Sequence, residues 1–161
     1  TISPSMDISV ASNFERLIYD YYLDRDSDLC SEFYQDFPLK SIHLNKSIWK
    51  KSTNLFLSYS VDDNSTYECM KFYYNNFNYI MDPHTAVAAN AVSKLETELR
   101  KKTIILSTAH PAKFPLPLKN AGINLKDIPK NLEKVMNKKE VSFKLSTSDN
   151  SIFEFIKENN Q

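Results

Sequence analysis

The sequence predicts an α/β fold in which helices pack on a mostly parallel sheet. Two observations support this prediction: three short apolar or alternating runs are typical of strands, and segments with apolar residues at helical spacing lie between them. Helices that alternate with strands favour a layered structure with parallel pairing. The predicted strands are Leu55–Val61, Thr103–Ser107 and Val141–Leu145, of which the last is also compatible with an antiparallel edge strand.

Length and composition are typical of one domain or of a segment of a larger protein. Of the 161 residues, 42% are apolar and 25% are charged, so the chain can bury a core. Lys plus Arg and Asp plus Glu number 20 each, so the net charge gives no reason to expect binding to nucleic acid or to an acidic membrane. The sequence lacks the run of roughly 20 apolar residues that a membrane helix needs. It also lacks a signal peptide, and we expect a cytoplasmic protein.

The first helix is predicted over Phe14–Leu23, where apolar residues recur at helical spacing. Ser12 or Asn13 can cap its start through a side-chain oxygen. Glu15 follows Ser12 by three residues, which is the spacing of a capping box.

The later helices are each predicted with a start or stop signal. Pro83 suits the first turn of a helix that Asp82 can cap, and the cations of Arg100–Lys102 are favourable at its end. Gly122 is a stop signal for a short helix before it. The pattern over Lys40–Thr53 favours neither helix nor strand. The later helices are expected over Ser27–Phe37, Asp62–Phe77, His84–Leu99, Leu116–Asn120, Ile128–Asn137 and Asp149–Ile156.

Cysteine and histidine usage does not predict a metal site. Cys30 and Cys69 are far apart in the sequence, and we expect two reduced thiols. His43, His84 and His110 have neither the HxxxH spacing nor a neighbouring cysteine that metal ligands commonly show.

The chain contains a single glycine, Gly122, where an average usage of roughly 7% would give about eleven. Loops that bind phosphate through backbone amides need glycine, because side chains would block the approach. We therefore expect that a phosphorylated ligand, if the protein binds one, is held by groups other than a Gly-rich loop of this chain. We also expect the chain to be a fragment whose other part lies upstream.

A polar turn follows the predicted strand Thr103–Ser107. Thr108 adds a second hydroxyl to that of Ser107, and His110 and Lys113 follow within five residues. Open α/β sheets place their ligands at the carboxyl ends of strands, which makes this turn a candidate site. An ordinary solvated connection is the alternative, because loops at strand ends are commonly polar.

The sequence resembles the C-terminal part of threonine synthase of the bacterial and fungal type. The likeness runs from Thr1 to about Gly122 and thins over the tail, residues 123–161. It departs from the family pattern at Asn78, where the family often has glycine. The segments that carry the resemblance, in order, are Ser5–Ser9 with Ser12–Arg16, Asp82–Ala88 and Ser107–Phe114.

The resemblance implies a pyridoxal-phosphate enzyme of fold type II, the fold type of the tryptophan synthase β subunit. It implies that O-phosphohomoserine and water become threonine and phosphate, by β,γ-elimination followed by water addition. The family's Schiff-base lysine and Gly-rich cofactor-phosphate loop lie upstream of its Met-Asp-Ile-Ser segment. We therefore expect no catalytic residue in this chain, and we expect the N-terminal part of the same enzyme as its partner. The isolated segment is expected to be inactive.

Five residues become candidates for the cofactor and substrate site through this resemblance. Thr108 matches the family hydroxyl that hydrogen-bonds the pyridine nitrogen. A hydroxyl, unlike a carboxylate, has no charge to hold a proton on that nitrogen, and it leaves the cofactor a weaker electron sink. His110 and Lys113 match family residues at the mouth of the same cofactor site. Asn13 and Arg16 match the Asn-Phe-Glu-Arg segment and are possible substrate or pocket residues.

Local structural roles are the alternatives for these side chains. His110 can equally be a loop histidine with its own hydrogen bonds, and Arg16 can pair with Glu15 or Asp20 on a helix surface. His84, at a helix start, is expected to pack or cap. The alternative function is a catalytically inactive binding or structural module derived from the same fold. A lysine-bearing cofactor segment upstream would distinguish the two functions.

Overall fold

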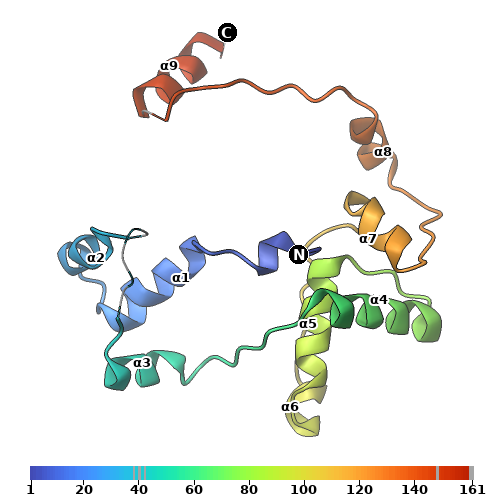
Figure 1. Ribbon diagram of the computed structural model, residues 1–161, viewed down its shortest axis with the longest axis horizontal. Coiled ribbons are helices and arrows are strands. Elements are labelled where there is room, and N and C mark those ends of the chain that lie inside the picture. Colours follow the sequence, from blue (N-terminus) through green and yellow to red (C-terminus); the bar gives the residue numbers. More distant parts are fainter. Residues whose placement is uncertain (38, 40, 42, 148, 160–161) are drawn as a thin grey trace. The chain divides into compact units, whose positions relative to one another are not determined.

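Figure 1 shows the computed structural model of the chain, which describes residues 1–37, 39, 41, 43–147 and 149–159. The chain forms two compact units, Thr1–Leu125 and Lys126–Gln161. Helical residues make up 55% of it, and no strand occurs within the described ranges. The predicted helices are therefore largely present, whereas the predicted sheet is not.

The helices are short, apart from α4 and α5 in the first unit and α9 in the second. In the first unit they are η1 (Pro4–Met6), α1 (Ser12–Leu17), η2 (Ile18–Tyr22), α2 (Ser27–Tyr34), α3 (Lys46–Thr53), α4 (Asp63–Phe77), α5 (Pro83–Ser93), α6 (Thr97–Lys101), η3 (Pro111–Lys113) and α7 (Pro115–Asn120). The second unit contains α8 (Lys130–Met136) and α9 (Asp149–Asn159).

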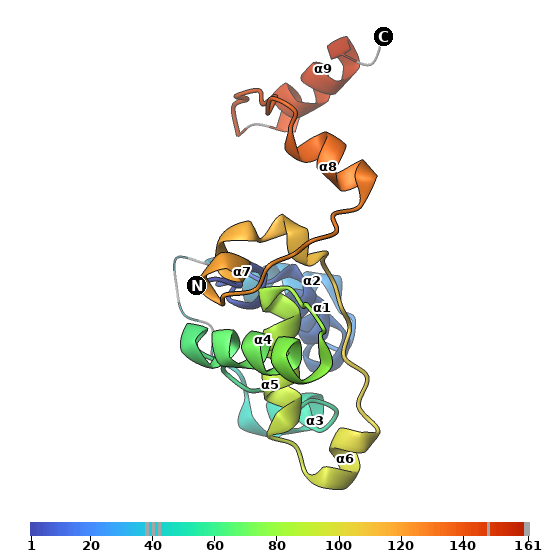
Figure 2. The same ribbon diagram turned by 90° about the vertical axis from the view of Figure 1, so that its right-hand side faces the viewer.

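Helices α4 and α5 cross each other and both contribute to the buried core of the first unit (Figures 1 and 2). Ala86 and Ala89 of α5 are buried there, and their small side chains allow the two helices to approach closely. The η1 turn also contacts α5. The buried residues of this core are Cys69, Met70, Met81, Ala86, Ala89, Leu118, Ala121 and Ile123.

The two ends of α4 follow from its flanking residues. The Asp62 carboxylate accepts the backbone N–H of Ser65 at 2.7 Å, as an N-cap does. The helix ends at Asn78, which has a left-handed backbone with φ of +51°. Glycine is the usual residue in this conformation and asparagine is among the few others that adopt it readily. Asn78 therefore takes the left-handed conformation at this helix end without glycine.

The first predicted helix is confirmed, but its predicted cap is wrong. α1 continues directly into η2, whose last turn is wound more loosely, with the N–H of Leu23 donating to the carbonyl of Ile18 at 2.9 Å. The N-cap is Ala11, which makes no side-chain hydrogen bond. The helix begins at Ser12 and not at Phe14, so Ser12 and Asn13 are already inside it and no capping box forms.

The long helix predicted over His84–Leu99 is instead two helices, α5 and α6. α5 ends at Ser93, whose hydroxyl donates to the carbonyl of Asn90 at 2.6 Å. Such a bond competes with the helical pattern of the backbone. The cations predicted at a helix end, Arg100 and Lys101, lie in the last turn of α6.

The prediction of a mostly parallel sheet is not confirmed, because none of the three predicted strands has a partner in the described part of the chain. Leu55–Val61, Thr103–Ser107 and Val141–Leu145 contain only turn or irregular backbone. Alternating apolar residues predict which side chains face a core, but a strand forms only where a neighbour supplies the ladder of hydrogen bonds. The side chains of Ile104 and Leu106 are 86% and 73% exposed, whereas Ile105 packs on the core.

In the second unit, an irregular segment lies between α8 and α9. Phe143, in the predicted strand, contacts Phe155 of α9 with ring centroids 5.0 Å apart. The segment before α9 is thus held by aromatic contact and not by a β ladder. Within the described residues of the whole chain, no helix is both long and apolar enough to cross a membrane.

Candidate functional site

The turn that follows Thr103–Ser107 lines a pocket of about 510 Å³. Ser107, Thr108 and His110 contribute to its lining. Apolar side chains contribute the rest. The lining residues are Tyr79, Ile80, Ser107, Thr108, Ala109, His110, Pro111 and Leu125.

The two hydroxyls of this pocket are free to bind a ligand. Ser107 and Thr108 are exposed, and neither hydroxyl has a hydrogen-bond partner among the described residues. A threonine hydroxyl can both donate one hydrogen bond and accept others. Thr108 is therefore available in the role that the resemblance implies for it.

His110 both lines the pocket and caps η3. Its Nδ1 accepts the backbone N–H of Ala112 at 3.2 Å. Because Nδ1 accepts, the hydrogen of the neutral ring is on Nε2, which is then a donor. His110 is thus a loop histidine with its own hydrogen bond, and it also lines the pocket.

The other three candidates lie elsewhere. Lys113 is the exposed last residue of η3 and does not belong to the pocket lining. Asn13 and Arg16 are exposed residues of α1, and they too are outside that lining. Arg16 makes no ion pair within the described ranges. The predicted partner, Asp20, pairs instead with Arg25 at 2.8 Å.

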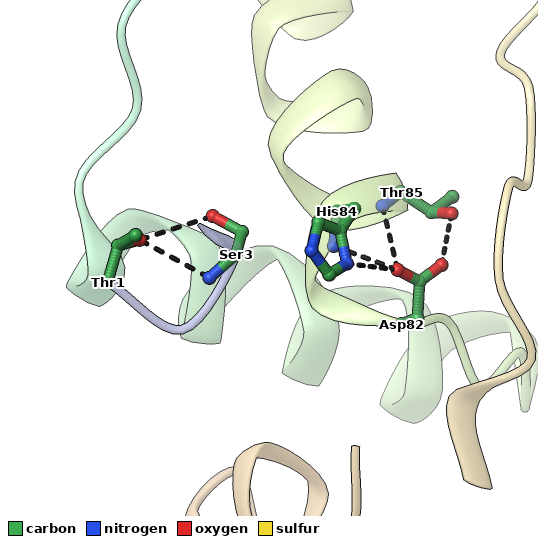
Figure 3. Close-up of polar contacts among 5 residues, drawn as sticks. All are labelled: Thr1, Ser3, Asp82, His84 and Thr85. Atoms are coloured by element: carbon green, nitrogen blue, oxygen red, sulfur yellow. Dashed lines mark hydrogen bonds and ion pairs between the residues drawn. The ribbon is translucent and has the colours of Figure 1, made fainter. Parts of the chain in front are cut away.

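A second polar cluster lies at the start of α5 and is shown in Figure 3. The carboxylate of Asp82 is fully buried. Its Oδ1 accepts the backbone N–H groups of His84 at 2.9 Å and Thr85 at 3.4 Å, and it lies 2.9 Å from His84 Nδ1. Its Oδ2 accepts the hydroxyl of Thr85. A carboxylate that caps a helix and binds two side chains fixes this corner of the fold.

The imidazole of His84 connects this cluster to the segment after the pocket. Its side chain is 6% exposed, and its ring centroid lies 4.8 Å from that of Phe114, the residue that follows η3. Its Nε2 is buried without a hydrogen-bond partner in the described part of the chain. The sequence-based expectation that His84 packs or caps is consistent with this environment, but it missed the carboxylate–imidazole pair. The Asp-Pro-His spacing at a helix start was the available signal.

The N-terminal turn is tied to α4 by a further carboxylate. The hydroxyl of Thr1 and the backbone N–H of Ile2 donate to Asp63 Oδ1 at 2.8 and 3.1 Å. These bonds, chiefly the one from Ile2, lower the pKa of Asp63. Figure 3 shows Ser3, which is buried, on the side of the His84 ring opposite Asp82.

Among the described residues, no group of three or more His, Cys, Asp or Glu side chains is arranged to hold a metal ion. The thiols of Cys30 and Cys69 are free, and burial raises the pKa of the Cys69 thiol. The hydroxyl-lined pocket beside η3 is thus the candidate site, and the cluster at the start of α5 adjoins its supporting turn.

Comparison with known proteins identifies the family. A sequence model described as "Threonine synthase, C-terminal" matches residues 85–156. Threonine synthase of Pseudomonas aeruginosa is 36% identical over 124 residues, covering 76% of this chain and 26% of that protein. Threonine synthase of Saccharomyces cerevisiae is 36% identical over 139 residues, covering 75% of this chain and 27% of that protein.

A solved structure agrees with the sequence matches. The crystal structure of PLP-bound threonine synthase from Brucella melitensis is similar with a TM-score of 0.70 and 27% identity, over 98% of this chain and 34% of that one. The fold is thus that of one segment of an enzyme family. The chain belongs to the threonine synthase family and corresponds to its C-terminal part. It spans about a quarter of the length of the curated relatives it matches.

Proposed function

We propose that the enzyme containing this segment is a pyridoxal-phosphate-dependent threonine synthase, which converts O-phosphohomoserine and water into threonine and phosphate. The observation that carries the proposal is the pocket beside η3, where the Thr108 hydroxyl has no partner among the described residues. This hydroxyl stands in the Ser107–Phe114 segment that resembles the family. The free thiols, Cys30 and Cys69, support a reducing, cytoplasmic location.

The pocket residues fit one end of the cofactor. Ile80, Pro111 and Leu125 offer apolar surface to a flat aromatic ring, and Thr108 offers a hydroxyl to its nitrogen. The lining contains no Gly-rich loop and no cation, so it does not fit the phosphate end. When bound, the cofactor supplies an electron sink for the reaction. In this proposal, the N-terminal part of the enzyme holds its phosphate and its Schiff-base lysine.

Each candidate residue then has a stated role. Thr108 hydrogen-bonds the ring nitrogen without placing a charge beside it. His110 offers its Nε2–H at the mouth while Nδ1 caps η3. The exposed cations Lys113 and Arg16, with Asn13 on the same helix as Arg16, are available to the substrate phosphate.

The proposal includes the sheet that the sequence predicts. Ile104 and Leu106 are exposed, whereas Ile105 between them packs on the core. This alternation is expected of a strand whose neighbouring strands are absent. We propose that Thr103–Ser107 joins a mostly parallel sheet of the complete fold type II enzyme. Amide hydrogen exchange of residues 103–107 tests this: protection in the complete enzyme is expected, and fast exchange there would contradict pairing.

The isolated chain is proposed to be inactive, because the lining contains no lysine and Lys113, at the end of η3, lies outside it. Covalent catalysis needs its nucleophile held against the cofactor. The test is incubation with pyridoxal phosphate, borohydride reduction and peptide mapping. Stoichiometric labelling of Lys113 together with turnover would contradict the proposal.

Substitutions in the complete enzyme test the role of Thr108. Thr108→Ala removes a hydrogen bond worth about 0.5–1.5 kcal/mol, so cofactor affinity should fall by up to about tenfold. Thr108→Asp should change the cofactor's absorption spectrum, since a carboxylate favours a protonated ring nitrogen. Ser107→Ala is the matched control, because it removes a hydroxyl from the same pocket wall. If Ser107→Ala weakens the cofactor and Thr108→Ala does not, the assignment is wrong by one residue. If neither does, the turn is structural.

A further inference from the structure

We propose that His84 is a positioning residue for the turn that carries Thr108, and that it acts through Phe114 while Asp82 holds its ring. This inference rests on the proposed function, because the turn matters only if Thr108 meets the cofactor. His84 does not belong to the pocket lining, so its effect would be transmitted by packing.

The first step is the orientation of the imidazole. A carboxylate only accepts hydrogen bonds, so the 2.9 Å contact requires His84 Nδ1 to donate to Asp82 Oδ1. The same oxygen accepts the backbone N–H of His84 at 2.9 Å, which ties the side chain and the main chain of one residue to one atom. The Asp82 side chain is fully buried, and its second oxygen is held by Thr85. These bonds hold the ring in one direction, and Figure 3 shows it facing the Asp82 carboxylate.

The second step is the contact with Phe114. The two ring centroids are 4.8 Å apart and the rings are tilted by 57°. Phe114 joins two elements: its N–H donates to the carbonyl of Pro111 at 2.9 Å and closes η3, and its carbonyl accepts the N–H of Leu118 at 3.2 Å at the start of α7. The ring contact with His84 thus ties the residue that closes η3 and precedes α7 to the start of α5.

The third step leads from η3 to the pocket. The N-cap of η3 is His110, whose imidazole lines the pocket with Thr108 only two residues earlier. Ala112, in the middle of η3, is 2% exposed, so the turn is seated on the interior and follows its neighbours. The contacts thus run from Asp82 through His84 and Phe114 to the wall that carries the hydroxyls.

A double-mutant cycle in the complete enzyme tests the proposal. His84→Asn keeps an amide N–H for Asp82 but removes the ring, and Phe114→Leu removes the other ring of the contact. Each should raise the dissociation constant for pyridoxal phosphate on the order of tenfold, since small displacements of positioned groups cost that much or more. The double variant should bind pyridoxal phosphate about as well as the single variant with the lower affinity, because both substitutions act through one contact. KM for O-phosphohomoserine at saturating cofactor should stay unchanged.

Ala89→Gly is the control, because it destabilises the same helix at a buried core position, and Ala89 has no aromatic ring to contact Phe114. Its cofactor affinity, measured well below its melting temperature, should equal that of the wild type. Independent, additive losses in the cycle, or an equal loss in Ala89→Gly, would overturn the inference. If Thr108→Ala also binds cofactor normally, the proposed function fails; if Thr108→Ala is weakened and His84→Asn is not, only this inference fails.

Discussion

Removal of the Asp82 carboxylate should be among the most destabilising single substitutions in the first unit. In Asp82→Ala, α5 loses its N-cap, which costs about 0.5–2 kcal/mol. The Nδ1–H of His84 and the hydroxyl of Thr85 also lose their acceptor, and these side chains are only 6% and 5% exposed. Because a buried donor without a partner costs about 1–3 kcal/mol and such terms are not additive, we expect a loss of roughly 3–5 kcal/mol.

Asp82→Asn separates the two contributions. The amide oxygen can still accept the backbone N–H groups and His84 Nδ1–H, so the cap survives. The amide nitrogen then faces the hydroxyl of Thr85, which loses its acceptor. We expect a loss of about 1–2 kcal/mol, typical of one buried hydrogen bond.

The assay is equilibrium urea unfolding of the 161-residue chain, followed by far-ultraviolet circular dichroism at concentrations where the chain does not associate. Asp26→Ala is the matched control, because Asp26 caps α2 through the N–H groups of Asp28 and Leu29 but is exposed. It should cost only about 1 kcal/mol. If Asp82→Ala costs no more than Asp26→Ala, water reaches the cluster and the reasoning from burial is refuted.

Three further perturbations test other parts of the chain. Bonds from the N-terminal turn lower the pKa of Asp63 below its ordinary value of 3.8, so their contribution is present above that pH and is lost as the pH falls below about 4. Urea midpoints at pH 5.5 and 3 should therefore differ less in Asp63→Asn than in the wild type, and an equal difference would contradict this. Gly122 has φ of +71° and open space at its Cβ position, so Gly122→Ala should cost about 1 kcal/mol through backbone strain; an unchanged melting temperature would contradict it. The exposed side chains of Ile104 and Leu106 should promote self-association of the chain. The double variant Ile104→Ser, Leu106→Ser should reduce association in light scattering and the binding of a hydrophobic dye, and no reduction would assign association to another surface.

Local signals in the sequence predicted the helices that depend on a few neighbouring residues. Asp62 starts α4, and Asp82 with Pro83 starts α5, because a cap needs only an acceptor and a free N–H two or three residues later. α7 ends just before Gly122, as predicted, and Gly122 has a positive φ. The helix over 14–23 was predicted in place, but its cap was not, because Ala11 leaves no side-chain signal.

The candidate site was predicted only in part, because its members come from different elements. The hydroxyl pair Ser107 and Thr108 and the nearby His110 are close in sequence, and they line one pocket. Tyr79 and Leu125 complete that pocket from distant positions, which no local pattern indicates. Lys113 is near in sequence, in η3, but lies outside the lining.

The sequence by itself determined the family of this protein, the positions of most helix starts and the alternation of apolar side chains in Thr103–Ser107. These properties depend on residues within a few positions of one another. Only the tertiary structure decided that no strand forms in the described chain, and that the Asp82–His84 pair lies buried against Phe114. The physical reason is the same in both cases. A β ladder and a buried polar cluster both depend on partners brought together by packing, and a local pattern does not specify which partners are present.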